Sequence, residues 1–217
     1  MQFFNEETTK QIKERMSKMD KAVKFILFIT EKDPKSNEVM ESFLGEMCAS
    51  SDKLTLEKSI VEKEQEKSKE YGVYAVPCFA LVAEEKRKVI YYGVPMGNEF
   101  STFLLDIIDV STGKPNISGD LVKKIEEIKE PMHLQVFVTD SCPHCPHAAK
   151  LAHDIAIINP NVQADVIDAA QFQPIAQAFR ITSVPTTIVD KKYALRGAMP
   201  LDVMLHKIEE AKKGKQG

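Results

Sequence analysis

The hydrophobic pattern of the first half of the chain recurs in the second half. Two short apolar runs, at residues 23–29 and 132–138, are each followed by a threonine, and Thr30 and Thr139 are 109 residues apart. Apolar residues at helical spacing precede the runs with the same offset: Ile12, Met16 and Met19, then Leu121, Ile125 and Ile128. Further on, segment 71–77 resembles segment 179–185, and each ends in Val-Pro before two more apolar runs and a glycine. Four similarities in one order predict an internal duplication.

Each half shows the same order of strands and helices. Strands are expected at 24–29, about 53–60, 78–82 and 88–92, and again at 134–138, 162–167, 186–189 and 193–196. Helices lie between them, with apolar positions 39, 43, 44 and 47 in one and 148, 151, 152 and 155 in its counterpart. This order favours parallel strands linked by right-handed crossovers, with an antiparallel hairpin at the end of each half. The predicted class is α/β, with two tandem units that each have a mixed central sheet and helices on both faces. Whether the two sheets join edge to edge stays open.

Turn-forming residues cluster at 111–120, where the apolar periodicity stops. Ser118 or Asp120 is expected to cap the helix that follows. We therefore place the boundary near residue 115, which gives a first unit of residues 1–115 and a second unit of residues 116–217.

The composition narrows the class of protein. Hydrophobic residues make up 43% of the 217, enough for ordinary cores, and the formal net charge is −3. Lysines alternate with glutamates and form no basic stripe, so we expect no nucleic-acid partner. The first residues do not resemble a signal peptide, and no apolar run approaches a membrane span, so we expect a cytoplasmic protein with no membrane partner. Four cysteines are too few for a disulfide framework, and cytoplasmic thiols are mostly reduced.

Two cysteines stand three residues apart in the stretch Thr139-Asp-Ser-Cys-Pro-His-Cys-Pro-His-Ala148. Cys142 follows a predicted buried strand and is expected to open a helix, with Ser141 or Cys142 as the cap and Pro143 at the first helical position. Unpaired N–H groups and the helix dipole lower the pKa of a thiol at that place. Cys145 is expected on the same helical face, deeper in the fold. Cys142 is thus the predicted attacking and leaving thiol, and Cys145 the resolving one.

Histidines accompany this pair. His144 lies between the cysteines, where a partly protonated imidazole stabilises the Cys142 thiolate and makes the pair a stronger oxidant. A solvated side chain is the alternative for His144. We expect His147 and His153 to be surface or packing residues of the helix.

Three other kinds of site use closely spaced cysteines. Covalent haem attachment needs a histidine directly after the second cysteine, where this chain has Pro146. A structural zinc site needs four ligands, and Cys48 and Cys78 lack the spacing of a second pair. The helix geometry also disfavours one ion held by the pair and His147, so we expect no metal. A structural disulfide would close a very small loop and add little stability.

The residues that carry a family resemblance are the strand, the segment Cys142-Pro-His-Cys145 and the segment Ser183-Val-Pro-Thr-Thr187 that follows about forty residues later. Together they resemble the thioredoxin superfamily over the whole second half, and the first half shares the skeleton. The chain is similar to the protein disulfide oxidoreductases, or glutaredoxin-like proteins, of thermophilic archaea and bacteria. Its layout also resembles the N-terminal domain of the flavoprotein reductase that serves bacterial peroxiredoxins. The expected fold is therefore two tandem thioredoxin-like units.

The resemblance implies roles for particular residues. Pro185 would be in the cis form beside the cysteines, and the backbone of Val184 and Thr186 would pair with an incoming peptide. The redox-active disulfide would serve without any further cofactor. Partners would be protein thiols and disulfides, with a redox partner such as a thioredoxin-reductase-like or peroxiredoxin protein.

The first unit departs from the resemblance. Asp33-Pro-Lys-Ser36 stands where its cysteines would be. With Pro77, the counterpart of Pro185, and Cys78 directly after it, Asp33 and Ser36 are expected to form a vestigial site. Cys78 is more typical of a small buried core residue than of a reactive thiol, and Cys48 is expected in the core too.

The second unit departs as well. Thioredoxin buries an aspartate in the strand before its cysteines, and here that place is Val136. The sequence still predicts a thiol–disulfide oxidoreductase that forms a mixed disulfide at Cys142 and resolves it with Cys145, with the first unit as a docking or structural module. The alternative is a non-catalytic or electron-relay protein that binds a partner through its paired units. The direction of electron flow stays open.

Overall fold

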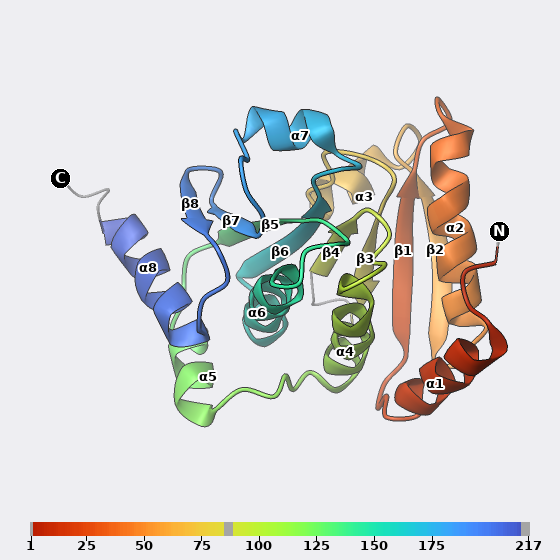
Figure 1. Ribbon diagram of the computed structural model, residues 1–217, viewed down its shortest axis with the longest axis horizontal. Helices are drawn as coiled ribbons and strands as arrows, with labels where there is room; N and C mark the ends of the chain where they lie inside the picture. The colour runs from red at the N-terminus through yellow and green to blue at the C-terminus, as the bar shows by residue number, and fades with distance from the viewer. Residues whose placement is uncertain (1, 85–88, 214–217) are drawn as a thin grey trace.

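The chain repeats one order of helices and strands, α-β-α-β-α-β-β-α, as the computed structural model shows (Figure 1). It describes residues 2–84 and 89–213. The first unit contains α1 (Glu6–Met16), β1 (Val23–Ile29), α2 (Pro34–Cys48), β2 (Leu54–Ile60), α3 (Gln65–Glu70), β3 (Cys78–Val82), β4 (Val89–Tyr92) and α4 (Glu99–Thr112). The second contains α5 (Gly119–Glu126), β5 (Met132–Val138), α6 (Cys145–Ile158), β6 (Val162–Asp168), α7 (Gln173–Ala178), β7 (Thr186–Val189), β8 (Tyr193–Arg196) and α8 (Leu201–Lys213).

All strands of the described residues belong to one sheet, in the order β2-β1-β3-β4-β6-β5-β7-β8. Within each unit the first two strands pair in parallel, and the remaining pairs are antiparallel. The units join where β4 pairs in parallel with β6, from Val89 opposite Ala164 to Tyr92 opposite Ile167. The question that the sequence left open is thereby answered, because the two sheets are continuous.

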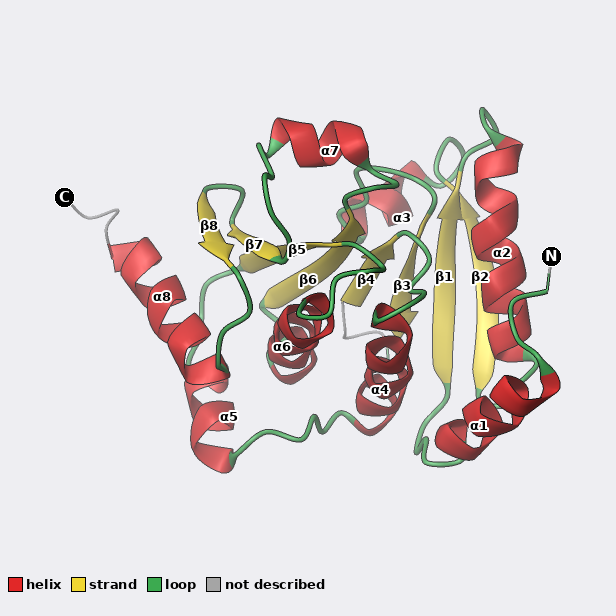
Figure 2. Ribbon diagram, in the orientation of Figure 1, coloured by secondary structure: helices red, strands yellow, loops and turns green. Residues whose placement is uncertain are grey.

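Two hydrophobic cores lie on opposite faces of the sheet, because successive side chains of a strand point to opposite sides. Phe25 and Phe79 belong to the larger core, which contains residues of α1, α2, α4, α6 and α8. Phe28 and Cys78 belong to the smaller one, which residues 71–76 and the helix α7 cover. We call the side of this smaller core the α7 face. Helices therefore cover both faces, as expected (Figure 2).

Some predicted limits differ from the structure. Residues 111 and 112 belong to α4, which ends at Gly113 with a left-handed φ of 70°. Ser118 stands at the N-cap of α5 without a side-chain hydrogen bond. Position 88, the expected first residue of a strand, lies outside the described residues. The expected boundary at residue 115 lies between α4 and α5 and stays a prediction.

One apolar position of the helical pattern predicted for α2 is not buried. Val39 is 44% exposed, whereas Met40 is buried. The buried positions 40, 43, 44 and 47 have the i, i+3, i+4, i+7 spacing of a single helical face. Val39 lies beside that face and remains accessible.

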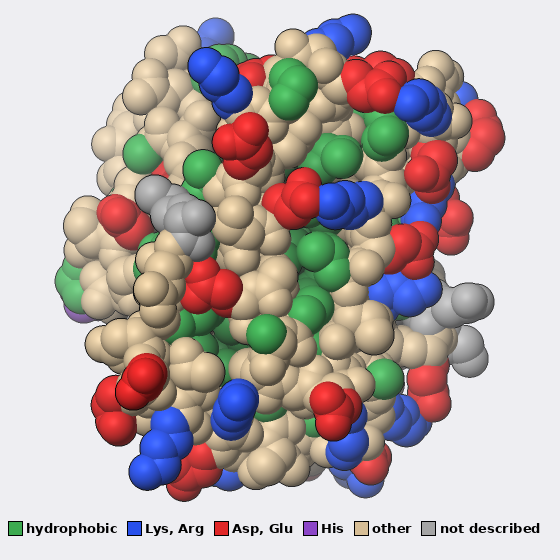
Figure 3. All heavy atoms as spheres, turned by 90° about the vertical axis from the view of Figure 1, so that its right-hand side faces the viewer, with side chains coloured by type: hydrophobic (Ala, Val, Ile, Leu, Met, Phe, Trp, Pro, Cys, Tyr) green, Lys and Arg blue, Asp and Glu red, His purple; other side chains and the backbone are tan. Residues whose placement is uncertain are grey.

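The surface over β2 and α2 carries charges of both signs without a patch of one sign (Figure 3). Lys24 pairs with Glu57 at 2.8 Å and Lys63 with Glu31 at 2.5 Å. Charged side chains on the edge strand β2 discourage pairing with other chains. Within the described residues, no helix has the length and apolar character needed to cross a membrane.

The aromatic centre of the larger core gives a test of the fold. The Phe103 ring on α4 lies 5.5 Å from that of Tyr91 and 5.8 Å from that of Phe79, and its side chain is fully buried. Phe103→Ala should lower the free energy of unfolding by about 3–5 kcal/mol. Leu105→Ala, on the same helix but 43% exposed, should change it by about 0.5 kcal/mol or less. Urea unfolding measures both, and equal effects would contradict the described burial of α4.

Candidate active site

Cys142 and Cys145 form a disulfide after the carboxyl end of β5, with their Cα atoms 5.5 Å apart. Cys142 is partly exposed and Cys145 is fully buried. This is the difference in accessibility that the sequence predicts for an attacking and a resolving thiol. A sulfur in solvent can therefore reach Cys142 but not Cys145.

The helix after β5 begins two residues later than predicted, at Cys145 and not at Pro143. α6 starts at Cys145, with Pro146 rather than Pro143 in its first turn. The preceding residues form a turn in which the Cys142 N–H donates to the Thr139 carbonyl at 3.1 Å. Both prolines suit a first turn, and this turn leaves Pro143 outside the helix. Cys142 thus precedes the helix, and the disulfide holds its sulfur next to the free N–H groups of the first turn.

His144 occupies the N-cap position of α6, and its side chain makes no capping hydrogen bond. It is exposed beside the disulfide, so its predicted influence on the Cys142 thiolate stays a prediction. His147 is also exposed, and its Nε2 lies 3.1 Å from the Met199 carbonyl oxygen. His153 is fully buried.

The residues predicted to contact substrate lie in the loop before β7 and at its start. The Val184–Pro185 bond is cis, as the resemblance implied, and so is the Val76–Pro77 bond of the first unit. Thr186 lies between Phe137 of β5 and Arg196 of β8, so both sides of its backbone face a partner strand. Pro185 and Thr186 are buried, and Val184 is partly exposed. Val184 and Cys142 both pack against the larger core.

The predicted vestigial site is only partly assembled. Asp33 is exposed and its carboxylate accepts a hydrogen bond from the Ser36 N–H at 3.3 Å, as an N-cap of α2. Ser36 and Pro77 line one hollow. The Cys78 side chain lies on the α7 face, whereas α2 packs on the opposite face. The expectation that Cys78 belongs to the vestigial site is therefore wrong, because strand alternation directs it to the other side.

The two free cysteines are poor nucleophiles. Burial raises the pKa of Cys48 to about 11. Burial, and next the Asp165 carboxylate, raise the pKa of Cys78 well above its usual range. A thiol reacts through its thiolate, so neither side chain is reactive near neutral pH. The expectation of a core residue holds for Cys78, and Cys48 is partly buried against the larger core.

Sequence reasoning missed a buried carboxyl group at the redox site. Val136 is fully buried, and the strand carries no acid there. Glu99, in the first turn of α4, is 3% exposed, and neither of its carboxyl oxygens has a hydrogen-bond partner among the described residues. Burial, and next the nearby Asp106 and Asp168, raise the pKa of Glu99 to about 8. Its sequence position gave no signal, because acidic residues are common in first turns.

Three contacts bring the start of α4, in the first unit, against the start of α6, in the second. The Asn98 N–H donates to the Asp140 carbonyl at 3.0 Å. Thr102 Oγ1, one turn after Glu99, donates to the Pro146 carbonyl at 3.5 Å. Glu99 and Asp140 also line one small cavity of about 10 Å³. A carboxyl group from one unit thus shares a cavity with Asp140 of the other unit, two residues before Cys142.

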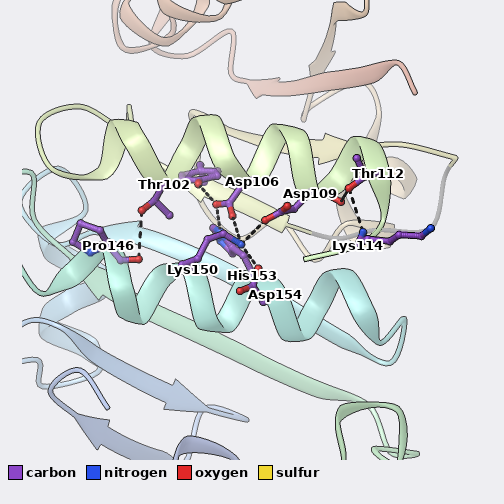
Figure 4. A network of polar contacts seen from close by, with 10 residues as sticks. Thr102, Asp106, Asp109, Thr112, Lys114, Pro146, Lys150, His153 and Asp154 are labelled. Atoms are coloured by element: carbon purple, nitrogen blue, oxygen red, sulfur yellow. Dashed lines mark hydrogen bonds and ion pairs between the residues drawn. The ribbon is translucent and has the colours of Figure 1, made fainter. Parts of the chain in front are cut away.

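A polar network continues along the contact between α4 and α6 (Figure 4). The His153 ring Nδ1 lies 2.6 Å from Asp106 Oδ2, and the Tyr91 hydroxyl donates to the same oxygen at 2.5 Å. Lys150 pairs with Asp109 at 2.7 Å and also with Asp154. The carboxylates of Asp106, Asp109 and Asp154 are close enough to hold a cation. The Lys150 ammonium already lies among them and supplies the positive charge.

Comparison with known proteins agrees with this geometry. Residues 132–210 match the thioredoxin domain family. The N-terminal domain of alkylhydroperoxide reductase AhpF from Enterococcus faecalis has a TM-score of 0.87 and 25% identity, and the match covers 94% of this chain and 99% of that one. Residues 132–210 therefore carry a thioredoxin domain, and the whole chain shares the fold of that AhpF domain.

Other proteins to which this chain is similar share less identity with it or are much longer. A protein disulfide oxidoreductase from Aeropyrum pernix matches with a TM-score of 0.87 over 99% of this chain and 96% of that one, and its 22% identity shows the fold alone. One component of the alkyl hydroperoxide reductase of Staphylococcus epidermidis is 27% identical over 204 residues, which are 94% of this chain and 37% of that protein. An NADH dehydrogenase of Ferdinandcohnia aciditolerans is 24% identical, over 83% of this chain and 33% of that protein. The chain thus spans about a third of these curated relatives.

The pKa of Glu99 makes stability depend on pH. A carboxyl group whose pKa is higher in the folded than in the unfolded protein binds more protons when folded, so stability falls as pH rises between the two values. For Glu99 that interval runs from 4.5 to about 8. Glu99→Gln should therefore become more stable relative to wild type as the pH rises from 5 to 8. Urea unfolding of the oxidised protein at each pH measures the difference. Glu38→Gln, at an exposed position of α2, is the control, and a constant difference for Glu99→Gln would contradict its burial as a protonated acid.

Proposed function

We propose that this protein is a thiol–disulfide oxidoreductase that exchanges two electrons with protein disulfides or dithiols through Cys142 and Cys145. The observation that carries the proposal is the disulfide itself, with one partly exposed sulfur and one fully buried sulfur at the start of α6. The raised pKa values of Cys48 and Cys78 support it as well, because they leave this pair as the reactive sulfurs among the described cysteines.

The exchange proceeds through a mixed disulfide. In the reducing direction, the Cys142 thiolate attacks a client disulfide, so that the client S–S bond breaks and one client thiolate leaves and takes a proton. Cys145 then loses its proton and attacks the Sγ of Cys142, which forms the Cys142–Cys145 bond and releases the second client thiolate. The client gains two electrons and two protons, and the pair becomes oxidised. The same steps in reverse oxidise a client dithiol.

Glu99 is proposed to take the proton of Cys145. Cys145 is fully buried, so the proton needs an acceptor inside the protein when the thiol becomes a nucleophile. The carboxyl group of Glu99 lies beside the start of α6, and its pKa of about 8 is close to the pH at which such a group exchanges protons well. Glu99 then returns the proton to the client thiolate that leaves.

Val184 is the proposed site of backbone pairing with a client peptide, because Thr186 already lies between two strands. The relatives named as alkyl hydroperoxide reductases support a peroxiredoxin or another thiol protein as partner, with a thioredoxin-reductase-like protein as a source of electrons. The chain matches only part of those relatives, so these partners belong to the proposal. A cytoplasmic location stays a prediction too.

Cysteine variants test the proposed chemistry. In insulin reduction driven by dithiothreitol, Cys142→Ser should fall to the rate of dithiothreitol alone. Reduced Cys145→Ser should retain the attacking thiol. Incubated with insulin without dithiothreitol, it should accumulate a mixed disulfide, visible as a mass increase that dithiothreitol added afterwards removes. Cys48→Ala should keep the wild-type rate. Activity of Cys142→Ser equal to wild type would refute the proposal and favour the alternative, a protein that binds its partner without redox chemistry.

A glutamine variant tests the role of Glu99. Because Glu99→Gln cannot accept the proton of Cys145, the decay of a preformed mixed disulfide at Cys142 should slow by roughly 10²–10⁴-fold near pH 7. The defect should shrink as the pH approaches the pKa of Cys145. Stopped-flow measurement of client thiol release gives the rate, with Glu38→Gln as the matched control. A decay as fast as that of wild type would remove Glu99 from the mechanism.

A further inference from the structure

A hollow of about 610 Å³ lies between the two units. One side is formed by the start of α2 with Val39 and by the loop with Val76 and Pro77, in the first unit. The other side includes Asp140 and Asp168, in the second unit. Its volume falls within the range of about 300–1,000 Å³ that is typical of ligand sites.

The hollow adjoins the proposed active site. Asp140, at its rim, precedes Cys142 by two residues in the same turn. Val76 holds the backbone position in the first unit that Val184 holds in the second, directly before the proline and the strand. A polypeptide bonded to Cys142 can therefore also contact the Val76 loop of the first unit. This loop is equivalent to the Val184 loop, but no cysteine pair accompanies it.

The wall of the hollow is apolar on one side and acidic on the other. Val39 is 44% exposed there. An apolar side chain exposed to water contributes no hydrophobic free energy to folding. Val76 and Met96 are partly exposed beside it. Among the described residues that line the hollow, the charged ones are Asp140 and Asp168. An occupant that matches both sides has an apolar group next to a positive charge.

We propose that this hollow binds the polypeptide that flanks the reactive cysteine of a client protein, and that it selects a segment in which an apolar side chain adjoins a lysine or arginine. The inference rests on the proposed function and names the class of client. Val39 and Val76 contact the apolar side chain, and Asp140 and Asp168 attract the basic one. The first unit, which lacks cysteines at residues 33–36, thereby contributes to client selection.

Two peptides test the selection. Each carries one cysteine as a mixed disulfide with glutathione, flanked by leucine and either lysine or glutamate, and bis(2-hydroxyethyl) disulfide serves as the small comparator. Wild type should have a kcat/KM several-fold higher for the lysine peptide than for the glutamate peptide. Val39→Lys should lower the ratio of kcat/KM for the lysine peptide to that for the small disulfide by roughly tenfold. Asp168→Asn, which keeps an oxygen for the backbone hydrogen bonds of Asp168, should weaken the preference for lysine.

Val203→Lys is the matched control, because Val203 is a comparably exposed valine on α8 that does not line the hollow. Its kinetic constants should equal those of wild type. Equal rates for the two peptides, or equal effects of Val39→Lys and Val203→Lys, would overturn the inference. If the wild-type protein still reduces the small disulfide when either of these results is found, the proposed function remains valid and only the inference about client selection is wrong. Failure of wild type to reduce any of the three disulfides would remove the proposed function and this inference together.

Discussion

The contact between the two units determines the shape of the redox site. β4 pairs with β6 in the middle of the continuous sheet, and α4 packs on α6 beside that junction. The two units approach closely at Gly97, where an added Cβ would lie 2.6 Å from the Asp140 carbonyl oxygen. Gly97 also has a φ of 58°, which glycine adopts without strain. A single small residue therefore allows the chain before α4 to lie against the turn that carries Cys142.

Buried polar groups fix how the two helices meet. Asp106 and His153 are both fully buried and come from different units. Leaving a buried polar group without its hydrogen-bond partner costs about 1–3 kcal/mol, so a shift of α4 along α6 that separates them is disfavoured. The apolar contacts around Phe103 stabilise the junction, but they would tolerate small shifts better than a buried hydrogen bond does. The position of Glu99 near the start of α6 thus depends on a contact two turns further along α4.

The sequence revealed what depends on local pattern, and it missed what depends on the contact between units. The repeated apolar runs were sufficient to predict the strands and their succession along the chain, because alternation and helical spacing are properties of short segments. The different exposure of Cys142 and Cys145 also followed from their positions after a strand. Glu99, Asp106 and His153 could not be recognised, because their roles arise where α4 meets α6, and no pattern in either half encodes that contact. The turn before Cys145 was not predicted, because Pro143 and Pro146 both suit the first turn of a helix. The hydrogen bond from the Cys142 N–H to the Thr139 carbonyl leaves Pro143 outside α6.

The absence of a cysteine pair at residues 33–36 is consistent with different roles for the two units, with redox chemistry in the second unit and client binding in the first. A thiol pair there would stand beside the hollow that Asp140, two residues before Cys142, also lines, and two pairs would compete for one client. With Asp33 and Ser36 in that place, a peptide in the proposed hollow beside Val76 and Pro77 would meet no reactive thiol pair of the first unit. Meanwhile the start of α4 supplies the second unit with the buried acid that its own strand lacks at Val136. Residues 116–217 alone would keep both cysteines but would lose Glu99, half of the hollow and the strand that covers the edge of β6. The redox site is therefore a property of the two units together, although both sulfurs belong to one of them.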